Sequence, residues 1–147
     1  MNRLARLVSL AFLATLPASA AELNVERLLT AIRSVEDWNG RDGHAGERGP
    51  YQFTRAAWEE TTKLPFALAR RETIAHAVAH NRVCKIATGL DRLKQEALPY
   101  EIALIWNAGL SAVLRNRAKP RSIDYARRVE NLYYQMQLSD NLSKAFR

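Results

Sequence analysis

The sequence predicts an all-α fold with at most one small β-hairpin. After residue 21, apolar residues recur at the three- and four-residue spacing of amphipathic helices, whereas the alternation typical of strands is weak. Glycines and prolines fall between these segments and mark the expected breaks. We expect residues 21–137 to form one domain, which packing alone must stabilise because the chain of 147 residues has only one cysteine, Cys84.

Residues 1–20 have the composition of a cleavable signal peptide. Arg3 and Arg6 precede an apolar run that ends before Pro17, and a small-residue cleavage site follows it. This run is too short to span a bilayer as an anchor, and no later segment is long and apolar enough. We therefore expect a periplasmic or secreted protein with no membrane anchor in its mature form.

The first helix is expected over residues 24–36, with Asn24 as its N-cap. Its apolar residues fill one arc of the helical wheel, and Glu36, the last residue, falls inside that arc. Burial and the negative end of the helix dipole both raise the pKa of such a carboxyl group. A carboxylic acid that keeps its proton near neutral pH is what a glycosidic general acid requires. The alternative is that the helix end frays and Glu36 turns to solvent.

The remaining segments follow in order along the chain. Residues 37–53 contain four glycines and a proline and are expected to form a loop or an irregular hairpin. The expected helices then cover residues 54–60, 69–88 (ended by Gly89), 100–107 and a short turn at 110–117, and a last helix is capped by Ser122. Residues 138–147 are expected to be a polar, frayed C-terminal tail.

Neither the net charge nor the potential metal ligands selects one functional class. The chain is basic, with a formal charge of +7, which favours anionic partners such as cell-wall polymers, lipid surfaces or nucleic acid without choosing among them. His76 and His80 are four residues apart on one expected helix, but no H-E-x-x-H pattern or third ligand accompanies them. We therefore expect no metal and no other cofactor, and interpret Cys84 as a small core residue.

Three segments occur in a fixed order and together resemble a known family. They are the helix ending in Glu36 with its glycine-rich loop, then Gly49-Pro50-Tyr51-Gln52, then Trp106-Asn107-Ala108-Gly109 with Tyr125 and Val129 further on. Over about residues 28–136 this resembles the lysozyme-like superfamily, most closely the soluble lytic transglycosylase domain and the invertebrate-type and goose-type lysozymes. The chain departs from the family pattern at Asp37, where serine is usual, and at Trp106, where tyrosine is usual.

The resemblance implies an enzyme that cleaves the β-1,4 bond between N-acetylmuramic acid and N-acetylglucosamine in peptidoglycan glycan strands. Glu36 is then the catalytic acid and base, in a lysozyme-like fold. Glycines 46 and 49 allow close approach of a sugar, and amide and aromatic side chains bind its substituents and faces. The expected substrate-binding residues are Gly49, Tyr51, Gln52, Trp106, Asn107 and Tyr125.

Whether a second carboxylate takes part decides the reaction type, and the sequence leaves its identity open. Asp37, Asp42 and Glu47 are the candidates, and Glu47 is our choice because a hairpin would place it opposite Glu36. Alternatively, Glu47 is a solvated residue paired with Arg48, and Glu36 acts alone with the acetamido group of the substrate. That single-acid route yields a 1,6-anhydro end, and we favour it over hydrolysis.

Two other functional classes compete with the enzyme. A non-catalytic lysozyme-like protein would bind glycan without cutting it, and a basic helical protein would bind nucleic acid with salt-sensitive affinity. The export signal and the glycine-rich loop after Glu36 argue against nucleic acid. We expect a monomer.

Overall fold

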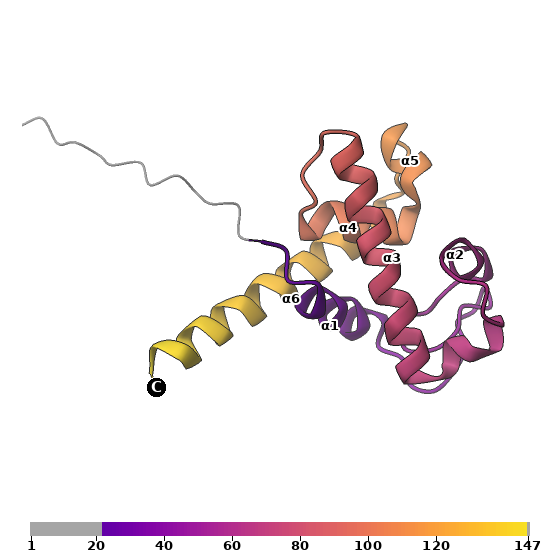
Figure 1. Ribbon diagram of the computed structural model, residues 1–147, viewed down its shortest axis with the longest axis horizontal. Helices are drawn as coiled ribbons and strands as arrows, with labels where there is room; N and C mark the ends of the chain where they lie inside the picture. The colour runs from indigo at the N-terminus through magenta and orange to yellow at the C-terminus, as the bar shows by residue number, and fades with distance from the viewer. Residues whose placement is uncertain (1–21, 147) are drawn as a thin grey trace, which may run out of the picture.

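The computed structural model describes residues 22–146, and within them the chain is all-α. Its elements in order are α1 (Val25–Glu36), α2 (Arg55–Thr61), the short 3-10 helix η1 (Phe66–Arg70), α3 (Glu72–Arg92), α4 (Pro99–Ala108), α5 (Leu110–Leu114) and α6 (Pro120–Ala145). Figure 1 shows α6 as a long helix that runs from the body of the molecule out to the C-terminus. The predicted all-α class is confirmed, and residues 1–20, the expected signal peptide, lie outside the described part.

The expected hairpin is reduced to a single antiparallel bridge within residues 37–53. Arg48 and Phe53 exchange both backbone hydrogen bonds, at 2.9 and 3.0 Å. The turn between them closes with the Gln52 N–H donating to the carbonyl oxygen of Gly49 at 2.9 Å. Gly49 and Gln52 both have positive φ angles, 73° and 43°, so the turn is tight. This bridge fixes where the glycine-rich loop ends relative to α2.

Helix α1 forms as the sequence predicts because both of its ends carry suitable residues. The side chain of Asn24 accepts a hydrogen bond from the Arg27 N–H at 2.9 Å, which satisfies one free donor of the first turn. At the other end, Asp37 adopts a left-handed conformation that terminates the helix directly after Glu36. The last helical residue is therefore held in a defined place.

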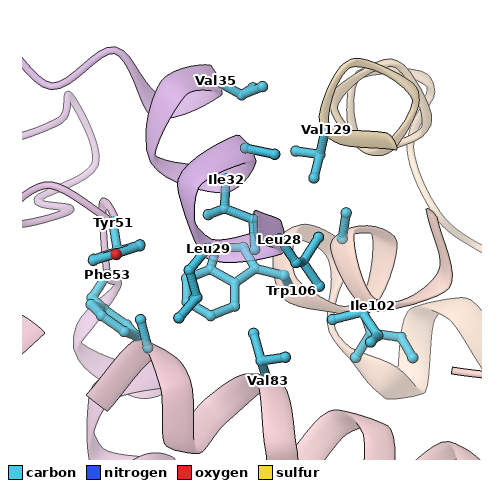
Figure 2. Close-up of a cluster of buried hydrophobic side chains, with 14 of the residues drawn as sticks. Leu28, Leu29, Ile32, Val35, Tyr51, Phe53, Val83, Ile102, Trp106 and Val129 are labelled. Carbon is cyan, nitrogen blue, oxygen red and sulfur yellow. The ribbon is translucent and has the colours of Figure 1, made fainter. Parts of the chain in front are cut away.

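The core lies between α1, α3, α4 and α6: α1 packs against α3 and α6, and α4 packs against the same two helices. In Figure 2 the side chains of Leu28 and Leu29 from α1 point toward Trp106 of α4, while Val129 of α6 faces α1. Leu28 and Leu29 are fully buried, and each such leucine contributes about 2 kcal/mol of hydrophobic stabilisation. The buried stripe of α6, including Tyr125 and Val129, covers the same face. Packing against α6 thus positions the C-terminal end of α1.

Two predicted helix boundaries are wrong. Helix α3 continues past Gly89 to Arg92, because Leu90 is buried at 1% exposure and its burial outweighs the roughly 1 kcal/mol cost of a helical glycine. Helix α6 starts at Pro120, which has no N–H to leave unsatisfied in the first turn. Ser122 is therefore not a cap but a buried residue inside that turn.

Two further expectations fail at the molecular surface. Residues 138–145 do not fray into a tail but continue α6, with exposed side chains, as far as Ala145. Cys84 is exposed on α3 rather than part of the core, and its Sγ lies 3.7 Å from His80 Nδ1. Among the helices of residues 22–146, none combines the length and apolar composition of a membrane span.

Candidate active site

A cleft of about 810 Å³ opens beside the C-terminal end of α1. One wall comes from α1 and the first turns of α6, and the other comes from the glycine-rich loop and α2. The residues that line it are Glu36, His44, Ala45, Glu47, Gln52, Phe53, Thr54, Ala56, Ala57, Glu60, Arg82, Trp106, Asn107, Ala108, Gly109, Arg121, Asp124, Tyr125 and Arg128. Six of the eight predicted site residues are among them.

Glu36 lies in this cleft with its carboxyl group held rather than free. It is the last residue of α1, on the arc that faces the core, and its Oε1 accepts a hydrogen bond from the Tyr125 hydroxyl at 2.7 Å. Burial raises the pKa of Glu36 to about 7, and the nearby Glu47 charge adds to the rise. The Tyr125 hydrogen bond and the Arg128 charge lower the pKa but do not cancel the effect. The expected rise in pKa is confirmed, and Glu36 does not turn into open solvent.

Tyr125 reaches Glu36 because α6 packs directly against α1. Its ring is buried at 8% exposure, and burial together with the Glu36 carboxylate raises the pKa of its hydroxyl well above the ordinary value. The phenol therefore stays protonated and remains a hydrogen-bond donor across the physiological range. A donor with no charge of its own orients the carboxyl group without creating an ion pair.

Glu47 lines the same cleft from the glycine-rich loop. Its Oε2 accepts a hydrogen bond from the Ala45 N–H at 3.0 Å, which holds the side chain close to its own loop. The predicted alternative, an ion pair between Glu47 and Arg48, is not formed: Arg48 approaches Asp42 at 3.6 Å instead. Two of the predicted acids, Glu36 and Glu47, thus line the cleft from two different structural elements.

The other candidates for a second carboxylate do not line the cleft. Asp42 pairs with Arg70, and this partner lowers its pKa. Asp37 terminates α1 and lies with Trp38 in a different pocket. Among the acidic candidates that the sequence offered, only Glu47 is placed beside Glu36.

Two predicted substrate-binding residues, Gly49 and Tyr51, do not line the cleft. Gly49 is buried, and a Cβ at this position would overlap the backbone carbonyl of Ala69, so the glycine permits contact with η1 rather than with a sugar. Tyr51 is 2% exposed, and its hydroxyl is hydrogen bonded to His76 Nδ1 at 2.7 Å. Both residues support the loop from behind.

The remaining predicted residues, Gln52, Trp106 and Asn107, line the cleft in different ways. Gln52 donates from Nε2 to the carbonyl oxygen of Gly49 at 2.8 Å, which fixes the side chain that edges the cleft. Trp106 is buried and presents only part of its ring. Asn107 is exposed at the end of α4, so its amide is free to donate to and accept from a ligand.

Sequence reasoning missed several polar residues that line the cleft. Glu60, Arg82 and Asp124 belong to three helices whose relative positions are set by long-range packing. No local motif marked them. Arg121 and Arg128 were visible only as part of a basic stretch, and their spacing of seven residues places them on one face of α6.

The histidines are engaged in contacts between helices. His76 Nε2 lies 3.1 Å and His80 Nε2 lies 3.9 Å from the Glu26 carboxylate on α1. Within residues 22–146 no group of three or more His, Cys, Asp or Glu side chains is arranged to hold a metal ion.

No family model, curated protein or solved structure matches this chain at a significant level.

Proposed function

We propose that this protein is an exported peptidoglycan-cleaving enzyme with a lysozyme-like fold, acting as a lytic transglycosylase. Its substrate is the glycan strand, cut at the β-1,4 bond between N-acetylmuramic acid and N-acetylglucosamine. The observation that carries the proposal is the buried Glu36 carboxyl, whose pKa of about 7 lets it act as an acid and then as a base near neutral pH. The order of the motifs along the chain supports the choice of substrate.

Glu36 performs both proton transfers in this mechanism. In its protonated form it donates to the bridging oxygen, so that the glycosidic bond breaks and the departing sugar takes the proton. The acetamido group of the muramic acid residue stabilises the positive charge at the anomeric carbon. The Glu36 carboxylate then removes the proton of the C6 hydroxyl, whose oxygen attacks the anomeric carbon and closes the 1,6-anhydro ring.

The surrounding residues hold the substrate and the acid in place. Tyr125 orients the carboxyl group through its 2.7 Å hydrogen bond, which limits the directions in which the proton can be delivered. Asn107 and Gln52 offer amide groups to the hydroxyl and acetamido groups of the sugars. Arg121 and Arg128 give this wall a positive charge, which attracts an anionic wall polymer.

Hydrolysis is the second candidate, because Glu47 lines the same cleft. In a hydrolytic muramidase Glu47 would act as nucleophile or as base toward water. We favour the transglycosylase route because Glu47 accepts a hydrogen bond within its own loop and lies on a non-helical segment. The cleavage product distinguishes the two routes.

The test uses purified sacculi, the mature protein and its Glu36→Gln variant. Mass analysis of the released muropeptides is expected to find 1,6-anhydro ends with the wild type and no release with the variant. Reducing ends would replace the proposal by a hydrolase. If the wild type binds sacculi but releases nothing, the protein is a glycan-binding lysozyme-like protein and not an enzyme.

A further inference from the structure

A second pocket of about 350 Å³ lies next to the cleft. Glu60, Arg82 and Gly109 line both hollows, so the two adjoin at these residues. Beyond this junction the walls come from α3, α4 and the start of α5, and they include Lys85, Ile86, Ile105 and Leu110. A ligand that fills the cleft can therefore extend a branch into the second pocket.

Two cations of α3, Arg82 and Lys85, lie at this junction, three residues apart on the helix. The Arg82 side chain is 12% exposed, and Nη1 donates both of its hydrogen bonds, to the Ala57 carbonyl oxygen and to Glu60 Oε2, each at 3.3 Å. Its Nε is buried and has no acceptor within residues 22–146. Lys85 Nζ donates to the Glu60 carbonyl oxygen at 2.7 Å. The guanidinium group of Arg82 is thus only partly satisfied by the protein.

The acidic group that faces Arg82 is easily displaced. The Glu60 side chain is 71% exposed, and such exposed ion pairs contribute little to stability. The Arg82 guanidinium is fixed instead by its burial and by its position 5.5 Å above the Trp106 ring. A ligand carboxylate can therefore replace Glu60 without disturbing Arg82.

We infer that this pocket binds the free carboxylates of the peptide attached to the muramic acid, an inference that rests on the proposed function. The sugars of the strand carry no free carboxylate when the lactyl group is amidated, so two cations beside apolar walls do not match the glycan itself. Ile86, Ile105 and Leu110 suit the aliphatic parts of a short peptide, and Arg82 with Lys85 suits its carboxylates. The enzyme accordingly prefers strands that retain their peptides.

The test measures binding by calorimetry in the Glu36→Gln background, which does not consume the ligand. Two ligands are compared: a tetrasaccharide bearing its peptides, and the same tetrasaccharide after an amidase has removed them. We expect the peptide-bearing ligand to bind about tenfold more tightly. Adding Lys85→Gln reduces this preference about fivefold, and adding Glu60→Gln increases it because a competing carboxylate is removed. Lys63→Gln, at an exposed lysine outside both hollows, serves as the matched control and leaves the preference unchanged.

The outcomes separate this inference from the proposed function. Equal affinity for both ligands, or a preference that Lys85→Gln does not change, overturns the peptide pocket while leaving the glycan cleft intact. Failure to bind either ligand overturns the proposed function as well. Since Lys85 is exposed on a helix, thermal unfolding of each variant checks that the fold is retained.

Discussion

Glu36 and Glu47, the two predicted acids of the cleft, differ in what holds them in place. Glu36 ends a helix whose buried face is part of the core, and a buried tyrosine from a second helix donates to it at 2.7 Å. Glu47 lies in a loop with a single backbone bridge at its end, and its partner is the N–H of Ala45, two residues away. Contacts between two helices therefore position Glu36, whereas a local contact within the loop positions Glu47.

In the proposed mechanism, this difference assigns the proton transfers to the helical wall, while the loop wall shapes the cleft. Burial behind α1 and α6 is the largest cause of the raised pKa of Glu36, and the Glu47 charge is a smaller one. A group that must change protonation state during a reaction benefits from a fixed, poorly hydrated position. Glu36 has that position, and Glu47 assists it through its charge.

The comparison predicts unequal losses of activity when each acid is neutralised. Glu36→Gln removes the only proton donor of the proposed mechanism and is expected to lower the rate of muropeptide release about 1,000-fold. Glu47→Gln removes only a nearby charge and is expected to lower the rate about tenfold or less. Release from sacculi at pH 6 measures both. Equal losses would assign Glu47 a direct catalytic part and favour hydrolysis.

The loop wall is expected to fail through packing rather than chemistry. Gly49→Ala places a Cβ against the Ala69 backbone at a positive φ of 73°, and we expect the free energy of unfolding to fall by about 4 kcal/mol. Gly46→Ala is the matched control: φ is 84° there, but nothing lies within 4 Å of the added Cβ, so the loss is about 1 kcal/mol. Urea denaturation measures both. Similar losses would mean that Gly49 is needed only for its backbone angle.

The features that the sequence predicted correctly are those that depend on neighbouring residues. The apolar arc of α1, its Asn24 cap and the position of Glu36 inside that arc all follow from spacing along one helix. The tight turn before α2 follows from its glycines and proline. For these features, local chemistry and the final fold favour the same conformation.

The features that it missed depend on which segments meet in space. Gly49 was assigned to sugar contact, whereas the segment against it is η1, twenty residues away. Tyr51 was assigned to the cleft, but its hydroxyl is hydrogen bonded to His76 of α3 instead. Arg82 carries no motif and is brought to the cleft only because α3 packs behind Trp106. Tertiary packing, which a single sequence does not display, decides each of these cases.

The burial of Glu36 has a cost in stability that depends on pH. Because its pKa is about 7 in the folded chain and 4.5 as the ordinary value, the folded state holds a proton between these pH values that the unfolded state has lost. The free energy of unfolding therefore falls as pH rises from 4.5 to 7, by about 3 kcal/mol in total. Glu36→Gln abolishes this loss. The difference in the free energy of unfolding between the variant and the wild type is therefore expected to shift in favour of the variant by that amount between pH 4 and pH 8.

Denaturation of both proteins at pH 4 and pH 8 measures the difference. Glu47→Gln is the comparison, because it leaves the buried carboxyl in place and so keeps most of the decline in stability with pH. A Glu36→Gln protein whose stability declines as steeply as that of wild type would show that Glu36 is well solvated.

The smallest expected effect comes from the hydroxyl group that orients the acid. The Tyr125 hydrogen bond lowers the pKa of Glu36, so Tyr125→Phe raises that pKa further. The alkaline limit of activity, set near pH 7 by loss of the Glu36 proton, then moves to higher pH. The maximal rate falls about fivefold because one orienting hydrogen bond is lost. Rates of muropeptide release from pH 5 to 9 measure both effects, and Tyr133→Phe, elsewhere on α6, is expected to change neither. A lower rate with an unmoved alkaline limit would mean that Tyr125 acts on the substrate and not on Glu36.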